Sequence, residues 1–147
     1  LVLETYSKPA FSKWFSLIWK NIYENGDRLI KLFDIRPHDA TLLAKSLSGG
    51  NQQKMIIARE VANEPELMIA AQPTRGLDVG AIEYVHQALV AQRNDGRGVL
   101  LISFELDEVI NVSDRIAVIF EGRIVGVLDA EDADEKQIGL LMAGGTV

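Results

Sequence analysis

The chain has 147 residues, of which 48% are hydrophobic and 24% are charged, the balance of an ordinary globular protein. Its formal net charge of −6 argues against a nucleic-acid-binding protein, and the lack of cysteine excludes disulfides and thiolate metal sites. No apolar run approaches the roughly 20 residues that cross a bilayer. The chain begins Leu1-Val2-Leu3, with neither a methionine nor a signal-peptide pattern, so we expect a piece of a longer protein.

The N-terminal segment, residues 11–33, has apolar residues at three- and four-residue spacing, which predicts one or two amphipathic helices. Asn25-Gly26 is a possible break between them. Four aromatic residues gather in its first half: Phe11, Trp14, Phe15 and Trp19. These side chains form either the local core of a small helical unit, which is the more ordinary arrangement, or a surface that binds a partner.

The rest of the chain alternates predicted helices and strands. Ser48 is a good N-terminal cap for a helix that must end before Pro65. Strands are expected at 67–71, 99–103, 115–120 and 123–128, and helices at 79–93, 105–111 and 134–142. Glu121-Gly122 is a hairpin turn between the last two strands. This alternation predicts an α/β fold with a partly parallel sheet covered on both faces.

The string LSGGNQQK occupies residues 47–54. A serine followed by two glycines at a helix start leaves backbone N–H groups unobstructed, and the helix dipole adds partial positive charge there. Such a site suits an anion, typically a phosphate. Taken alone, however, Ser-Gly-Gly at a helix start is more often only a cap.

Further motifs, together with this string, carry a resemblance to a known family. LSGGNQQK resembles the signature motif of ABC ATPases, in the form common among bacterial importers of simple sugars and nucleosides. Residues 73–78, Pro-Thr-Arg-Gly-Leu-Asp, match the family's Pro-Thr-x-Gly-Leu-Asp, whose last residues form the D-loop. Strand-like strings at 67–70, 100–103, 113–116 and 121–125 follow in the family's order. AAQPTRGLDVGA, SFELDE and LLMAGG are most similar to the second cassette of nucleoside-type importers.

The resemblance implies a partial P-loop NTPase cassette. It would be the C-terminal part of the second ATP-binding cassette of such an importer, with a mostly parallel sheet flanked by helices plus a helical subdomain. Residues 1–64 would be the helical subdomain with the signature helix, and residues 65–147 the C-terminal half of the nucleotide-binding core.

The site residues also follow from the resemblance. In ABC ATPases two cassettes pack head to tail, and the signature of one covers ATP held by the other. The residues implied in ATP binding in trans are Ser48, Gly49, Gly50, Asn51 and Gln52, and those at the D-loop interface are Gly76, Leu77 and Asp78. Arg75 should face the same interface, either in a salt bridge or against nucleotide.

Three positions depart from the family pattern. Ala71 and Gln72 stand where Asp-Glu usually precedes Pro-Thr, and Phe104 stands at the usual switch histidine. Alanine cannot ligate a cation, and glutamine is a poor general base. The chain also contains no G-x-x-x-x-G-K-[ST] phosphate loop. We therefore expect no intact catalytic residue, no metal site and no tight nucleotide binding here, with ATP and Mg²⁺ as cofactors of an ATP-hydrolysing full-length protein.

The resemblance also implies partners and a location. They are another cassette in the same polypeptide or a dimer, permease subunits and, indirectly, a solute-binding protein, at the cytoplasmic face of the membrane. Residues 11–33 would belong to the arm that meets the permease. The alternative is a non-transport ABC ATPase of the DNA-repair or translation-factor type. The acidic charge and the lack of coiled-coil insertions or basic arms favour the importer and no nucleic-acid partner, and no residue here specifies the solute.

Overall fold

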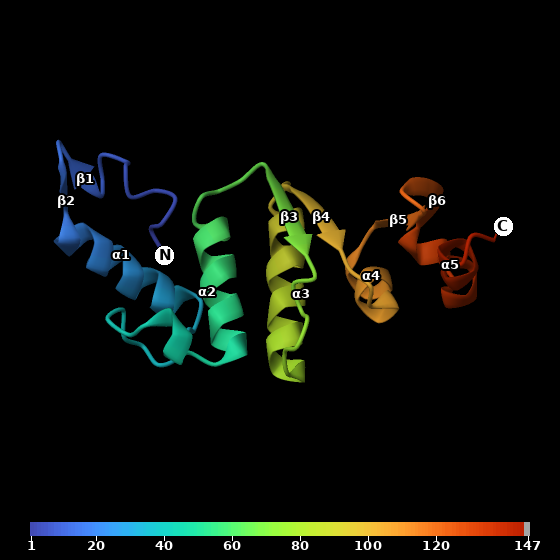
Figure 1. Ribbon diagram of the computed structural model, residues 1–147, viewed down its shortest axis with the longest axis horizontal. Helices are drawn as coiled ribbons and strands as arrows, with labels where there is room; N and C mark the ends of the chain where they lie inside the picture. Colours follow the sequence, from blue (N-terminus) through green and yellow to red (C-terminus); the bar gives the residue numbers. More distant parts are fainter. Residues whose placement is uncertain (146–147) are drawn as a thin grey trace. The chain divides into compact units, whose positions relative to one another are not determined.

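The computed structural model describes residues 1–145 and forms two compact units. The first unit comprises Leu1–Met68 and Pro73–Gly98, and the second comprises Ile69–Gln72 together with residues from Val99 onward. The fold class is α/β, as predicted, with helices and paired strands along the chain (Figure 1). The expected division between residues 64 and 65 stays a prediction.

The first unit begins with a β-hairpin, not with a helix. Strands β1 (Ser12–Lys13) and β2 (Ser16–Leu17) are antiparallel, and helix α1 (Trp19–Leu32) follows them. The prediction of helix from residue 11 was therefore wrong for the hairpin, because Trp14 takes a φ of 57° that a right-handed helix does not allow. The prediction of a local aromatic core was also wrong, since the side chains of Trp14 and Phe15 are exposed.

Helix α1 continues through the expected break. Gly26 is buried within α1, and a Cβ atom there would lie 3.3 Å from the Cβ of Ala40. The glycine thus admits a close approach of the following loop, and this packing outweighs its low helix propensity. Ile30, Ile35 and Ala58 form the core between α1 and the signature helix.

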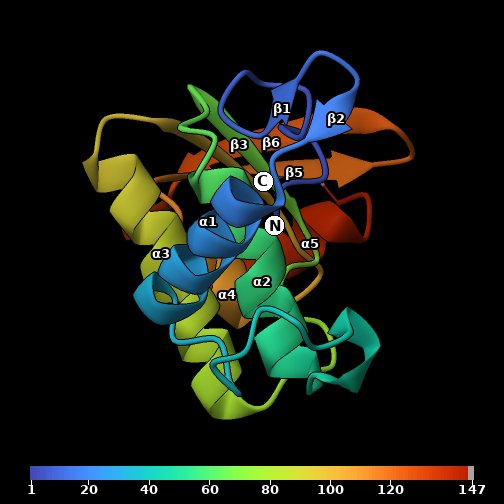
Figure 2. The same ribbon diagram turned by 90° about the vertical axis from the view of Figure 1, so that its left-hand side faces the viewer.

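Helix α2 (Gly49–Val61) carries the signature, and helix α3 (Val79–Asn94) packs beside it. Within the first unit α2 lies between α1 and α3 (Figure 1), and Figure 2 shows the same helices from the side of α1. The buried face of α3 holds Ala81, Val85 and Leu89 at four-residue spacing, which is the pattern of one helix face against a core. A short 3₁₀ helix, Ala44–Ser46, precedes the signature.

Strands β3 (Leu67–Ala71) and β4 (Gly98–Ile102) form the parallel pair. The N–H of Gly98 donates to the carbonyl of Glu66, and the N–H of Gln72 donates to that of Ile102, each at 2.8 Å. The residue numbers of the bonded partners increase together along both strands, so the strands run in the same direction. Alternate side chains of both strands are exposed, so the expectation that helices cover both faces is not met in this chain.

The second unit is built around an antiparallel hairpin. Helix α4 (Leu106–Val112) precedes strands β5 (Arg115–Phe120) and β6 (Arg123–Asp129), and helix α5 (Glu135–Met142) follows a 3₁₀ turn at Ala130–Asp132. Its core consists of the buried side chains of Ile116, Val118, Ile138 and Leu141. The elements predicted after residue 48 are confirmed within one or two residues. Across the described residues, no helix combines the length and the apolarity that crossing a membrane requires.

Candidate functional site

The N-terminus of α2 is capped by Ser48. Its backbone is extended, with ψ at 158°, and its side-chain oxygen accepts from the backbone N–H of Asn51 at 3.4 Å and from the Asn51 amide at 2.9 Å. Helix geometry leaves the N–H groups of the first turn without acceptors inside the helix. Gly49 and Gly50 occupy the first two positions, so their N–H groups are not screened by a side chain.

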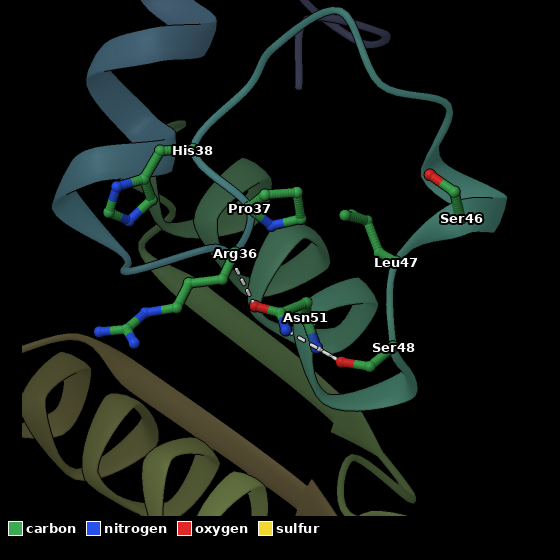
Figure 3. A pocket seen from close by; sticks show the side chains of 7 residues that line it. All are labelled: Arg36, Pro37, His38, Ser46, Leu47, Ser48 and Asn51. Atoms are coloured by element: carbon green, nitrogen blue, oxygen red, sulfur yellow. Dashed lines mark hydrogen bonds between the residues drawn. The ribbon is translucent and has the colours of Figure 1, made fainter.

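Two amide side chains fix the loop in front of this helix. The Oδ1 atom of Asn51 accepts from the backbone N–H of Arg36 at 2.7 Å, and the amide of Gln52 donates to the carbonyl of Leu47 at 2.8 Å. Figure 3 shows Asn51 between Arg36 and Ser48, bonded to both. These bonds occupy both amides, which places Asn51 and Gln52 as supports of the capped helix end.

An open pocket of about 590 Å³ adjoins the cap. Its lining residues come from the loop after α1 and from the start of α2: Arg36, Pro37, His38, Ser46, Leu47, Ser48 and Asn51 (Figure 3). A helix N-terminus attracts negative charge, while the Arg36 guanidinium lies 2.9 Å from Asp34 and is directed away from Ser48 (Figure 3). Anion binding beside the Ser-Gly-Gly string stays a prediction.

Asp34 joins the loop to α2 through three basic side chains, a cluster that the sequence analysis missed. Its Oδ1 atom lies 2.9 Å from the Nε of Arg36 and 3.4 Å from the Nε2 of His38. Its Oδ2 atom lies 3.6 Å from the Nζ of Lys54, which also donates to the Asp34 carbonyl at 3.2 Å. Lys54 in turn lies 4.6 Å from the ring centroid of Tyr84 on α3. Alternating Asp-x-Arg-x-His was the available signal, but it does not indicate the partner 20 residues away.

Two groups in and beside this cluster, Asp34 and Tyr84, have shifted pKa values. The hydrogen bond from Arg36 lowers the pKa of Asp34 below its ordinary value of 3.8, and His38 and Lys54 act in the same direction. Burial raises the pKa of Tyr84 above its ordinary value of 10.0, and the Asp34 carboxylate adds to that rise. The pKa of Asp34 falls because its carboxylate is held in the charged form beside basic groups, whereas the pKa of Tyr84 rises mainly because the phenol is partly buried.

An Asp34→Asn variant should therefore change the acid dependence of stability. A lowered folded-state pKa contributes stability that is present above the unfolded pKa and is lost as pH falls through the folded value. Wild type should be the more stable chain at neutral pH, and the difference should shrink as pH falls below about 3.8. Urea unfolding midpoints across this range measure it. Asp27→Asn, an exposed change on α1, is the charge-matched control, and equal pH profiles for both variants would contradict the role of Asp34.

The D-loop lies against the signature helix. Asp78 caps α3 by accepting from the N–H of Ala81 at 2.9 Å, and Gly76 supplies the positive φ of 74° in the preceding turn. A Cβ atom on Gly50 would lie 3.0 Å from the Cβ of Ala81 and 3.8 Å from Asp78 Oδ2. A Cβ atom on Gly49 would come no nearer than 4.0 Å, to Leu77. The structure thus brings the two predicted groups together, while Arg75 is exposed.

The three departing positions gather at one end of the parallel strand pair. Ala71 ends β3, Gln72 follows it with a φ of 49°, and its N–H bonds Ile102 at the end of β4. Phe104, two residues beyond Ile102, is 77% exposed. The side-chain nitrogen of Gln72, Nε2, is buried and has no hydrogen-bond partner.

Mg²⁺ does not fit this end of the strands. Alanine offers no side-chain oxygen at residue 71, and the hard cation requires oxygen ligands in near-octahedral array. Within residues 1–145 no group of three or more histidine or acidic side chains could hold a metal ion. Ala71 therefore contributes no ligand to a Mg²⁺ ion, and the lack of catalytic chemistry at this end of the strands stays a prediction.

Solved structures define the class of fold. A dimeric bacterial ABC transporter cassette matches 81% of this chain and 51% of its own, with a TM-score of 0.64 and 24% identity. A metal-chelate type ABC transporter in an inward-facing conformation matches 91% of this chain and 51% of its own, with a TM-score of 0.71 and 19% identity. The fold is that of part of an ABC-type, P-loop NTPase cassette, as the motifs predicted.

Sequence relatives narrow the class. The nucleoside import ATP-binding protein NupA of Lactococcus lactis is 51% identical over 147 residues, and the guanosine import ATP-binding protein NupO of Bacillus subtilis is 52% identical over 146. The glucose import ATP-binding protein TsgD13 of Haloferax volcanii is 45% identical over 97% of the chain. No protein-family model matches. The chain is homologous to the ATP-binding proteins of nucleoside and sugar importers, which confirms the predicted resemblance.

The match covers part of each relative. The chain spans 29% of the length of NupA and of NupO and 26% of that of TsgD13, while nearly all of its own length is matched. This agrees with the prediction that it corresponds to the C-terminal part of one cassette.

Proposed function

We propose that the chain is part of the ATP-binding subunit of an ABC importer for a nucleoside or simple sugar, and that its signature serves ATP bound by the other cassette. The observation that supports this proposal is the capped N-terminus of α2. It offers the N–H groups of Gly49 and Gly50 beside a pocket that includes Arg36, with the D-loop packed against the same helix end.

The ATP held by the partner cassette supplies the phosphoryl group whose release drives transport. This chain's part is to bind and orient it. The N–H groups of Gly49 and Gly50 donate to phosphate oxygens, favoured by the helix dipole. The Ser48 hydroxyl, which accepts from Asn51, keeps its own proton free to donate to the phosphate. Such preorganised donors stabilise developing charge without reorganising as the reaction proceeds.

The second part of the proposal concerns the nucleotide site to which Ala71, Gln72 and Phe104 belong, which we call this chain's own half-site. We propose that this half-site is inactive in hydrolysis. Ala71 cannot hold Mg²⁺, Gln72 cannot act as a general base at neutral pH, and Phe104 offers no polar atom to a phosphate. The full-length protein then depends on one competent composite site. Its proposed partners are a second cassette, permease subunits and, through them, a solute-binding protein, at the cytoplasmic face of the membrane and without nucleic acid.

The isolated chain should neither bind Mg-ATP tightly nor hydrolyse it. It lacks a G-x-x-x-x-G-K-[ST] loop, and a signature contributes donors to one side of the phosphate only. Isothermal calorimetry with Mg-ATP and a phosphate-release assay provide the measurement, with the full-length importer subunit as the positive control. Micromolar binding, or turnover that survives rigorous purification, would show that this part of the proposal is wrong.

A further inference from the structure

The turn between β1 and β2 consists of Trp14 and Phe15 alone. Two-residue hairpin turns with a positive φ at the first position usually place glycine there, whereas this turn has tryptophan at a φ of 57°. Trp14 is 89% exposed and Phe15 is fully exposed. Within the described residues, neither side chain gains burial in return for the unfavourable backbone.

The turn is held on a fixed support. The N–H of Ile18 donates to the carbonyl of Phe11 at 2.8 Å, and the Asn21 amide of α1 donates to the carbonyl of Ala10 at 2.7 Å. The first bond closes the base of the hairpin, and the second ties its N-terminal end to the first turn of α1. The aromatic surface continues onto that helix, where the exposed rings of Trp19 and Tyr23 lie 6.3 Å apart.

The charge around these rings differs from that of the chain. Three exposed lysines, Lys8, Lys13 and Lys20, lie between Thr5 and Tyr23, a stretch without any acidic residue in a chain of net charge −6. Lys20 lies 3.8 Å from Glu24, and both side chains are largely exposed. The segment that carries the apolar rings therefore also carries positive charge, of which that of Lys20 is paired with Glu24. We call Trp14, Phe15, Leu17 and Trp19, with the three lysines, the hairpin patch.

We propose that the hairpin patch binds the anionic surface of a lipid bilayer. Tryptophan rings favour the headgroup level, where an apolar ring and an N–H group are both accommodated, and lysines beside them bind lipid phosphates. One aromatic insertion with a few lysines gives reversible association, unlike a spanning helix. The charge complementarity favours anionic lipid over an apolar groove on a protein or a second acidic copy of this chain. The inference does not depend on the proposed role of the signature.

Tryptophan fluorescence tests the proposal directly, because both tryptophans of the chain, Trp14 and Trp19, belong to the patch. Emission should shift to the blue when vesicles of phosphatidylcholine with phosphatidylglycerol are added to the chain. In the single-tryptophan variants Trp19→Phe and Trp14→Phe, brominated lipid should quench Trp14 more strongly than Trp19, since Trp14 lies at the turn.

In a vesicle co-sedimentation assay, substitutions separate the apolar contribution to binding from the electrostatic one. Trp14→Ser should weaken binding about tenfold through lost apolar contact. Lys13→Gln should weaken binding to anionic vesicles about fivefold and leave binding to pure phosphatidylcholine unchanged. Matched controls in the second unit, Ile124→Ser and Lys136→Gln, change an exposed apolar residue and an exposed lysine and should not alter binding.

Any one of four results in the presence of lipid or permease would overturn the proposal. They are absence of a blue shift, equal binding to neutral and anionic vesicles, insensitivity to Trp14→Ser, and shielding of Trp14 that requires permease subunits. A blue shift that grows with protein concentration in the absence of lipid would instead assign the patch to a second copy and would equally overturn it. None of these outcomes bears on nucleotide binding, so failure here is distinguishable from failure of the proposed function.

Discussion

A Gly49→Leu substitution in the full-length protein should lower the ATPase rate about a hundredfold, the effect of losing a preorganised donor to a reacting anion. The leucine side chain would occupy the approach of the phosphate to the first N–H groups of α2. The fold should tolerate a small side chain there, because a Cβ atom on Gly49 meets its nearest neighbour at 4.0 Å. Steady-state phosphate release by the purified transporter measures the effect.

Two companion variants separate the possible causes of lost activity. Gly49→Ala reports on the smallest side chain at the same position, and the unfolding midpoint of the chain should not move. Gln72→Glu restores a carboxylate at the degenerate half-site and should change the rate little, since Ala71 still cannot serve the metal. Full activity in Gly49→Leu would contradict the role of the signature at the partner's ATP. A severalfold rise in the rate of Gln72→Glu would contradict the inactivity of this chain's own half-site.

Ile35→Ala should cost about 2–5 kcal/mol of unfolding free energy, the usual penalty for emptying a buried aliphatic site. Ile35 is 2% exposed and packs with Ile30 and Ala58 between α1 and α2. It also lies between Asp34 and Arg36, so the cavity would loosen the loop that lines the pocket. Urea unfolding followed by circular dichroism provides the measurement.

Leu32→Ala is the matched control for this cavity. The removed atoms are similar, the residue lies three positions earlier, and its side chain is 67% exposed. Its cost should stay within about 0.5 kcal/mol, as for an ordinary surface substitution. Similar losses in the two variants would mean that Ile35 is not part of a close-packed core.

The chain from Ser48 onward was predictable because its local signals agree with one another. Ser48 and Asp78 are caps whose side chains bond the third residue of their helices, and Glu121-Gly122 forms the expected turn with positive φ at both positions. Caps, turns and apolar runs are properties of a few consecutive residues, so sequence alone locates them.

The hairpin at residues 12–17 was not predictable by the same reasoning. Its apolar spacing matches a helix, and its turn contains neither glycine nor asparagine, which are the usual signals. Bonds from Ile18 and Asn21 back to Phe11 and Ala10 decide the conformation instead. The Asp34 cluster escaped prediction because Lys54 reaches it across 20 residues, a contact that no local pattern encodes.

Small residues set the spacing between the signature helix and the D-loop helix. Gly50 faces Ala81, and neither side chain has rotamers to sample or a charge to titrate. At this contact the spacing of α2 and α3 is therefore set by van der Waals contact, which ionic strength does not screen, unlike a spacing held by a salt bridge. The loop around Asp34 is held instead by exposed ion pairs, whose attraction weakens as the salt concentration rises.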